Sequence, residues 1–134
     1  MERDTILITD DVDLNRELIK FIFEEEYQIL EANDGQRAIE IIQENSERLC
    51  LIFLDLIMPI KSGVDVLEFM NKEHYIESIP AIMITGETMD EAGEKALEYG
   101  ASDIIYKPFS PNVIMRRAKR IMELYEYKRN MDIL

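Results

Sequence analysis

Residues Leu49–Asp55, Leu-Cys-Leu-Ile-Phe-Leu-Asp, carry the strongest fold signal in this chain. Its first six residues are apolar, show no helical period and have the length of a strand, which predicts a β-strand buried on both faces. Pro59 and Gly63, with polar residues between them, predict a turn after Asp55. Because ligands bind just beyond the carboxyl ends of strands in open α/β sheets, Asp55 is a candidate reactive group.

Four more short apolar runs alternate with helical patterns on either side of this stretch. The expected strands are Asp4–Thr9, Tyr27–Ala32, Leu49–Leu54, Pro80–Thr85 and Asp103–Tyr106. Strict alternation of strands and helices predicts an α/β fold, a doubly wound parallel sheet with helices on both faces. Right-handed crossovers favour the flavodoxin-like five-strand order 2-1-3-4-5.

Helix signals occupy each gap between the expected strands. Asp13 is the expected N-cap of the first helix, whose apolar period is Leu14, Leu18, Ile19, Ile22 and Phe23. The fourth helix is expected over Glu87–Tyr99 and closes at Gly100; its thin apolar stripe predicts the least stable helix. Ser110-Pro111 opens the last helix.

Length and composition bound the class of protein. A chain of 134 residues predicts one compact domain, which we place at residues 1–125, with 126–134 as a helical extension, a tail or the start of a linker. No apolar run reaches the ~20 residues of a membrane span, and no signal peptide is expected. The single cysteine, Cys50, indicates a packing residue in a reducing cytoplasm. A net charge of −13 argues against nucleic acid as a partner of this chain alone.

Oxygen-bearing side chains and one lysine follow the expected strands. Asp10 and Asp11 come after the first strand, Asp55 after the third, Thr85 ends the fourth, and Lys107 follows the fifth. Three carboxylates within about 5 Å of one another repel by several kcal/mol, and a divalent cation resolves that repulsion. An all-oxygen donor set with few carboxylates suits Mg²⁺ better than Ca²⁺.

This set of residues also predicts a reaction. The ammonium of Lys107 and the hydroxyl of Thr85 can hold phosphoryl oxygens while a carboxylate attacks phosphorus and becomes an acyl phosphate. Asp55 lies on the middle strand and is the expected nucleophile, whereas Asp10 and Asp11 suit the metal. Structural alternatives are a helix-entry cap for Asp10 and Asp11, a loop acid for Asp55 and a surface lysine for Lys107.

Five short motifs in this order resemble the receiver domain of two-component response regulators. They are Asp10-Asp11, Asp55-Leu-Ile-Met-Pro, Gly63 eight residues after Asp55, Thr85-Gly86, and Gly100-Ala-Ser-Asp followed by Lys107-Pro108-Phe109. The resemblance implies that Asp55 accepts phosphate from a histidine kinase or a histidine phosphotransfer protein. It further implies Mg²⁺ bound by Asp10, Asp11, Asp55 and the backbone carbonyl of Ile57, with Thr85 and Lys107 on the phosphoryl group.

One position departs from the pattern of that family. The switch aromatic expected three residues before the lysine is replaced by Ile104, and a tyrosine, Tyr106, stands directly before Lys107. Positions 104 and 106 of a strand share a face, so Tyr106 is expected near Thr85. Ile57 and Glu87 occupy positions that tune the lifetime of the phosphate in the family.

The last helix is basic although the rest of the chain is acidic. Such a run is a solvated face, or it meets the acidic 87–98 helix of a second copy in a homodimer through helix 4, strand 5 and helix 5. The leading function is a phosphoacceptor signalling domain that catalyses only its own phosphorylation and dephosphorylation. Two alternatives are an aspartyl-phosphate phosphatase, which needs an acid where Ile57 stands, and a phosphate-independent interaction module.

Overall fold

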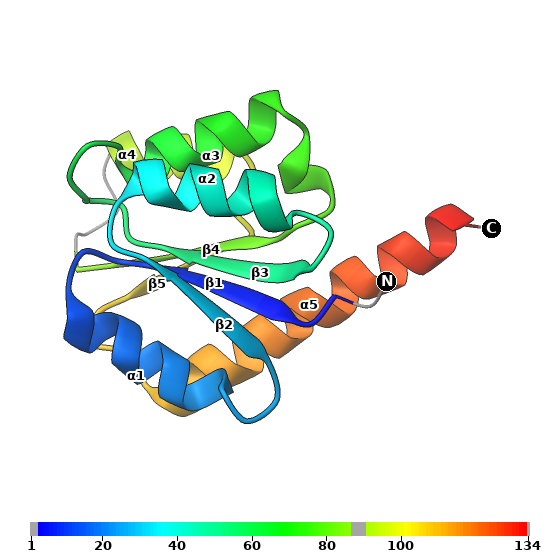
Figure 1. Ribbon diagram of the computed structural model, residues 1–134, viewed down its shortest axis with the longest axis horizontal. Helices are drawn as coiled ribbons and strands as arrows, with labels where there is room; N and C mark the ends of the chain where they lie inside the picture. Colours follow the sequence, from blue (N-terminus) through cyan, green and yellow to red (C-terminus); the bar gives the residue numbers. More distant parts are fainter. Residues whose placement is uncertain (1–2, 87–90, 134) are drawn as a thin grey trace.

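Five parallel strands form a single sheet in the order β2-β1-β3-β4-β5, as predicted. The computed structural model describes residues 3–86 and 91–133. Its strands are β1 (Thr5–Thr9), β2 (Gln28–Ala32), β3 (Leu49–Leu54), β4 (Ala81–Thr85) and β5 (Asp103–Tyr106). Its α-helices are α1 (Asp13–Phe23), α2 (Gly35–Asn45), α3 (Gly63–Lys72), α4 (Glu91–Glu98) and α5 (Pro111–Ile133), and a short 3₁₀ helix, η1, covers Tyr75–Glu77. Figure 1 shows α1 and α5 on one face and α2, α3 and α4 on the other.

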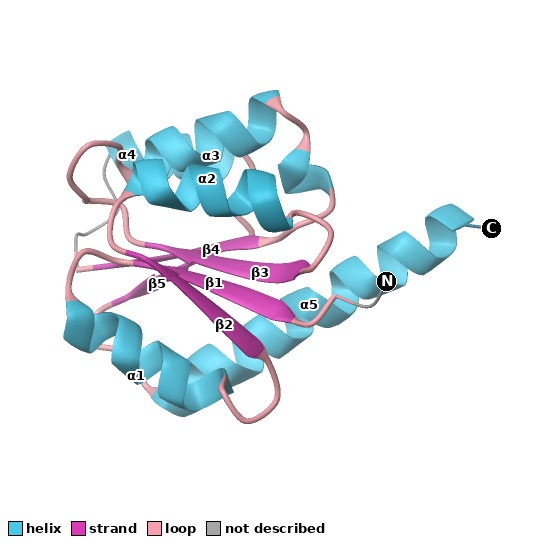
Figure 2. Ribbon diagram, in the orientation of Figure 1, coloured by secondary structure: helices cyan, strands magenta, loops and turns pink. Residues whose placement is uncertain are grey.

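The central strand β3 is buried along its whole length and supplies both halves of the core. Ile52 and Leu54 join the cluster under α2 and α3, whereas Phe53 joins the cluster under α1 and α5. The Phe53 ring lies 5.6 Å from the ring of Phe23, measured between centroids. Cys50 is a free, buried thiol on this strand, as predicted, and its Sγ donates to the carbonyl of Thr5 at 3.4 Å. Figure 2 shows the sheet enclosed between the two helical layers. Because both faces are covered, an apolar residue is needed at every position of β3.

The start of α1 differs from its prediction. Val12 is the N-cap and Asp13 is the first helical residue, so the assignment of Asp13 as N-cap is wrong. The reason is that the first helical hydrogen bond forms one residue earlier: Arg16 N–H donates to Val12 O at 3.3 Å. The Asp13 carboxylate pairs with the Arg16 side chain, and Val12 N–H donates to Asp10 Oδ1 at 2.9 Å. Within the predicted apolar period of α1, Leu14 and Leu18 remain exposed.

The described part of α4 is shorter than the predicted helix. It covers Glu91–Glu98, and Glu87 lies outside the described residues. Ala96 packs in the core, whereas Leu97 is exposed. Gly100 follows with φ +102°, and its N–H donates to Leu97 O at 3.1 Å, which fits its predicted capping role. The low stability of this helix stays a prediction.

Helix α5 begins at Pro111, as predicted, and continues without a break through the expected boundary at residue 125. Its far end extends past the sheet in Figure 1. Even so, neither α5 nor any other helix within residues 3–86 and 91–133 combines the length and the apolar character that crossing a bilayer requires.

Candidate functional site

The carboxyl ends of β1 and β3 bring three aspartates together. Asp10 and Asp55 are 2% and 8% exposed, while Asp11 is exposed to solvent. One carboxylate oxygen from each residue lies within 4.8 Å of the others. Strands β1 and β3 are hydrogen-bonded neighbours with Thr9 opposite Leu54, so the residue after each strand arrives at the same edge of the sheet. The predicted convergence of Asp10, Asp11 and Asp55 is therefore present.

Lys107 reaches into this acidic cluster from the far end of β5. Its Nζ lies 2.8 Å from Asp55 Oδ2 and 3.2 Å from Asp10 Oδ2. Its backbone N–H donates to Thr85 O at 2.8 Å, which fixes where the lysine leaves the sheet. One ammonium thus bridges two buried carboxylates that come from different strands.

Backbone hydrogen bonds hold both buried aspartates in place. Asp55 N–H donates to Thr9 O at 3.1 Å, and Asp10 N–H donates to Ala32 O at 3.2 Å. Asp55 Oδ1 accepts from Ile57 N–H at 3.2 Å. These contacts join the two aspartates to the parallel ladder, so their carboxylates have little freedom to separate.

The electrostatics of the cluster are unbalanced in favour of negative charge. Burial raises the pKa of Asp55 above its ordinary value, and the hydrogen bonds from Lys107 and the Ile57 N–H offset this only in part. Burial alone would lower the pKa of Lys107, but its hydrogen bond and charge interaction with Asp55, together with Asp10, raise it. Three carboxylates against one ammonium leave a net negative site with oxygen donors only, which fits a hard divalent cation.

The glycine after the turn is required by close approach of the chain. A Cβ at Gly63 would lie 2.1 Å from the backbone carbonyl oxygen of Asp55. Gly63 N–H donates to Leu56 O at 3.1 Å, which closes the turn between β3 and α3. The motif spacing from Asp55 to Gly63 therefore has a steric cause, since α3 starts against the backbone carbonyl of Asp55.

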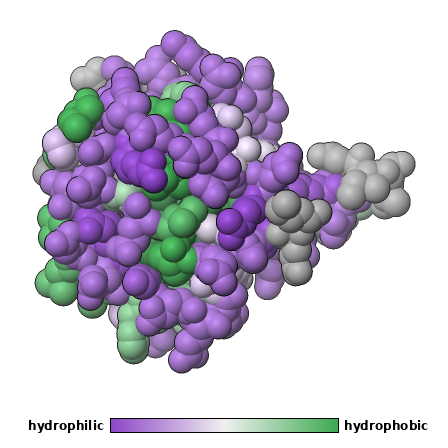
Figure 3. Space-filling model, viewed as in Figure 1, coloured by the Kyte–Doolittle hydropathy of each residue, from purple (hydrophilic) through white to green (hydrophobic). Residues whose placement is uncertain are grey.

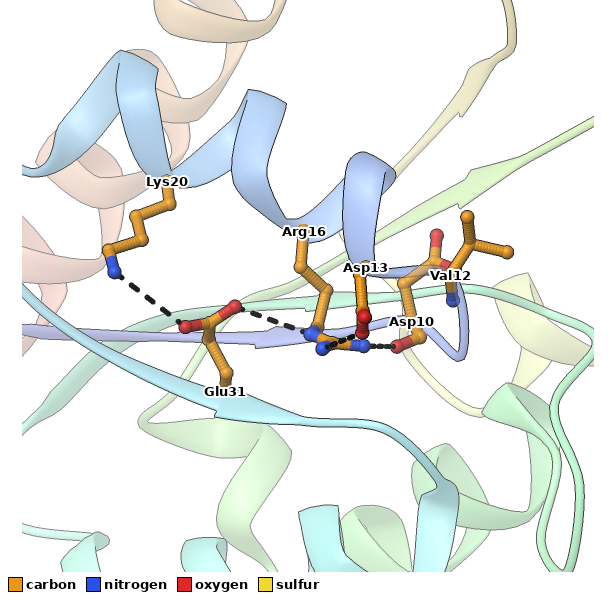
Figure 4. A network of polar contacts seen from close by, with 6 residues as sticks. All are labelled: Asp10, Val12, Asp13, Arg16, Lys20 and Glu31. Carbon is orange, nitrogen blue, oxygen red and sulfur yellow. Dashed lines mark hydrogen bonds and ion pairs between the residues drawn. The ribbon is translucent and has the colours of Figure 1, made fainter.

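Arg16 is a site residue that the sequence analysis missed. Figure 4 shows it reaching from α1 towards the Asp10 main chain, where its Nη1 donates to Asp10 O at 2.8 Å. Its other guanidinium nitrogens meet Asp13 and Glu31, the latter at 3.2 Å. Burial would lower the pKa of Arg16, but the hydrogen bonds to Asp13 and Glu31 outweigh it and raise the pKa. An arginine three residues after an aspartate indicates only a helix ion pair, so no sequence signal distinguished it.

The fourth strand end places Thr85 beside Tyr106. The register pairs Thr85 with Tyr106 and Met83 with Ile104, which agrees with the expectation that Tyr106 lies near Thr85. Thr85 is buried, Ile104 packs in the core, and Tyr106 is exposed. In the family that the sequence resembles, this position holds the switch aromatic; here it holds Ile104, an aliphatic core residue.

Known proteins resemble this chain in sequence along most of its length. The family model described as response regulator receiver domain matches residues 6–119. The transcriptional regulatory protein SrrA of Staphylococcus aureus (strain NCTC 8325 / PS 47) is 38% identical over 118 residues, which are 87% of this chain and 47% of that protein.

Solved structures of receiver domains have the same fold as this chain. A CheY-like response regulator receiver domain protein from Methanospirillum hungatei JF-1 is 27% identical with TM-score 0.85, over 94% of this chain and 98% of that one. NtrX from Brucella abortus is 28% identical with TM-score 0.84, over 97% of this chain and 29% of that one. The chain spans about half the length of the curated relatives it matches. By sequence and by fold, the chain belongs to the response regulator receiver domain family.

Proposed function

We propose that Asp55 is the phosphoacceptor of a two-component phosphorelay. The observation that carries the proposal is the Lys107 ammonium, 2.8 Å from the Asp55 carboxylate at the end of the central strand. A carboxylate oxygen of Asp55 attacks the phosphorus of a phosphohistidine, the P–N bond breaks as the P–O bond forms, and the imidazole nitrogen takes up a proton as it leaves. Lys107 and Thr85 hold the equatorial oxygens of the transferred group.

The acidic cluster is the proposed Mg²⁺ site. Asp10, Asp11 and Asp55 would hold the ion with the backbone carbonyl of Ile57, because the three carboxylates already lie within 4.8 Å of one another. When bound, the ion supplies positive charge opposite the oxygens of the transferred group. Two properties of the site favour Mg²⁺: all its donor atoms are oxygens, and the single charge of Lys107 does not neutralise the three carboxylates.

The proposed phosphodonor is a protein, a histidine kinase or a histidine phosphotransfer protein in the cytoplasm. Val12 and Ile57 donate their N–H groups to site carboxylates, so their exposed side chains border the site. In Figure 3 several green patches lie along the left edge, the side where the strand-end loops lie in Figure 1. The exposed apolar residues on α1 and these loops are Val12, Leu14, Leu18, Phe21, Ile57 and Ile60. Apolar surface around a polar site favours docking of a protein over capture of a small substrate alone.

Phosphorylation is proposed to change the surface formed by α4, β5 and α5. Thr85 pairs in register with Tyr106, which is exposed on β5, so a ligand on Thr85 is one strand away from that surface. The described part of α4 packs on the core chiefly through the small side chain of Ala96. Because so little apolar surface holds this helix, two positions of α4 can differ in free energy by only a few kcal/mol. This surface is also the proposed homodimer contact. In this scheme the domain acts only on its own phosphorylation and dephosphorylation.

The decisive experiment is intact-mass analysis after incubation with an acyl phosphate and Mg²⁺. We expect an adduct of about 80 Da on the wild type and none on Asp55→Asn. Asp34→Asn is the matched control, because Asp34 caps α2 and asparagine caps equally well. An adduct that persists in Asp55→Asn contradicts the assignment.

A second experiment distinguishes docking of the protein donor from the phosphorylation reaction itself. Leu14→Glu on the exposed face of α1 is expected to slow phosphotransfer from a histidine kinase and leave the reaction with acyl phosphate unchanged. Equal loss in both reactions would refute the docking role. Partner binding and output that survive Asp55→Ala would instead indicate the phosphate-independent module.

A further inference from the structure

Three large apolar side chains are exposed in a row on the far end of α5. Leu124, Tyr127 and Met131 are 56%, 63% and 49% exposed. Their spacing of three and then four residues is that of the a and d positions of a heptad, the pattern of a coiled-coil seam. The segment belongs to the part of α5 that extends past the sheet in Figure 1.

The opposite side of α5 is attached to the domain, so this row faces away from it. Ala118 and Met122 pack in the core. Further along, Tyr125 Oη donates to Ile76 O at 3.2 Å and Arg129 Nη1 donates to Ser78 O at 3.0 Å. At 3.6 residues per turn, the average direction of these four residues around the helix axis is about half a turn from that of the Leu124–Tyr127–Met131 row. The body therefore cannot cover the row without releasing both hydrogen bonds.

The charges beside the row match a parallel pairing of two copies. With Leu124 at an a position, Glu123 is at g and Lys128 is at e, five residues later. In a parallel, in-register pair, g of one helix faces the following e of the other, so Glu123 would meet Lys128 of the second copy twice by symmetry. An antiparallel pair would instead place like charges together. Both side chains are exposed, and Lys128 also lies 5.1 Å from the centre of the Tyr125 ring.

The row has a defined beginning. The preceding a and d positions are Arg117 and Arg120, whose like charges oppose close pairing of two helices. Arg117 is held within its own chain, with its Nε donating to Asp103 Oδ2 at 2.7 Å. Two copies would therefore separate towards their globular bodies and meet only from Leu124 onward.

We propose that residues 124–131 of α5 form a parallel two-stranded coiled-coil contact with a second copy of this chain. The contact gives the segment after residue 125 a function in dimerisation. It is independent of the chemistry at Asp55, and it differs from the α4, β5 and α5 surface because it uses only the projecting end of one helix. Since the row covers about one heptad, association of the isolated chain is weak and rises with concentration.

Cysteine cross-linking of the full chain tests the pairing and its direction. Met131→Cys places a thiol at an a position, where a parallel pair brings the two copies into disulfide reach. Glu126→Cys is the matched control, since position 126 is exposed and lies away from the row. We expect a disulfide-linked dimer on mild oxidation of Met131→Cys, at least several-fold more than with Glu126→Cys. Equal yields overturn the proposal.

Sedimentation over a concentration series tests the energetics. Leu124→Glu is expected to abolish association, whereas Phe21→Glu, an equally polar change at an exposed site on α1, leaves it unchanged. Glu123→Lys should weaken the dimer, and the added change Lys128→Glu should restore it. A wild type that stays monomeric at every concentration, or a double charge reversal that fails to rescue, contradicts the parallel pairing.

Discussion

Lys107 and Asp55 are 52 residues apart in the sequence, yet the lysine Nζ lies 2.8 Å from Asp55 Oδ2. The same ammonium is 3.2 Å from Asp10 Oδ2. It is the only lysine or arginine within 4.0 Å of these two carboxylates among residues 3–86 and 91–133. Without Lys107, the two buried carboxylates would have no cation partner among these residues.

Lys107→Met is expected to destabilise the fold by about 1–2 kcal/mol without Mg²⁺, because two buried carboxylates lose their shared cation. Saturating Mg²⁺ should recover most of the loss. Lys72→Met removes an exposed pair with Glu68 at 3.6 Å and should change stability by less than about 0.5 kcal/mol. Urea denaturation with and without Mg²⁺ measures both. A loss that Mg²⁺ does not recover would show that the lysine acts through packing.

Gly63→Ala is expected to cost roughly 2–3 kcal/mol of folding free energy, because its Cβ would lie 2.1 Å from Asp55 O and neither backbone segment can yield freely. Gly86→Ala is the control, since nothing lies within 4 Å of a Cβ built there. Thermal denaturation compares the two. Similar melting temperatures for both variants would contradict the steric cause of the motif spacing.

Ile60 has φ +68°, a conformation that is unfavourable for a β-branched residue. Ile60→Asn should stabilise the protein by about 0.5–1 kcal/mol, because asparagine tolerates the left-handed region. Ile57→Asn provides the comparison: Ile57 is also an exposed isoleucine of this loop, but its φ is not positive. An equal effect at both positions, measured by denaturation, would attribute the gain to lost surface hydrophobicity.

Arg16→Lys is expected to weaken Mg²⁺ binding roughly tenfold, because lysine cannot hold Asp10 O and Glu31 at once as the guanidinium does. Lys20→Met tests the specificity: Lys20 pairs with the same Glu31 at 3.8 Å, and within the described part of the chain the Asp10 carboxylate forms its ion pair with Lys107 instead. Calorimetric titration with Mg²⁺ gives both affinities. Equal losses would assign the effect to Glu31 instead of the Asp10 carbonyl.

Burial raises the pKa of the Cys50 thiol to about 11, whereas an unfolded cysteine ionises near 8.5. Between these values the folded state keeps a proton that the unfolded state has lost, so stability falls as pH rises from about 9 to 11. Below that window the thiol is protonated in both the folded and the unfolded state, so it causes no loss of stability there. We expect Cys50→Ala to show a smaller fall in this range.

The same thiol should resist alkylation by iodoacetamide at pH 8, with labelling roughly 100-fold slower than in urea, because reaction requires opening of the core. Intact-mass time courses measure the two rates. Rapid labelling of the native protein would show that Cys50 is accessible.

The sequence predicted the strand order and the cluster of Asp10, Asp11, Asp55 and Lys107 because each depends on a pattern that local chemistry sets. Apolar runs of strand length end at these residues, and parallel strands with right-handed crossovers bring their carboxyl ends to one edge. The N-cap at Val12 was beyond this reasoning. It depends on Arg16, whose backbone N–H donates to Val12 O and whose guanidinium binds the Asp13 carboxylate.

Periodicity and turn signals act within a few residues of each position. They were therefore enough to predict the layers, the sheet order and the side chains that meet at the site. Three features became visible only in the folded chain: the bond from Arg16 to the Asp10 carbonyl, the close approach of Gly63 to the Asp55 carbonyl, and the outward row on α5. The first two contacts join residues only six and eight positions apart, but each depends on how a loop folds back at the edge of the sheet. The third depends on which side of α5 packs against the domain. Packing sets both, and periodicity and turn signals do not record it.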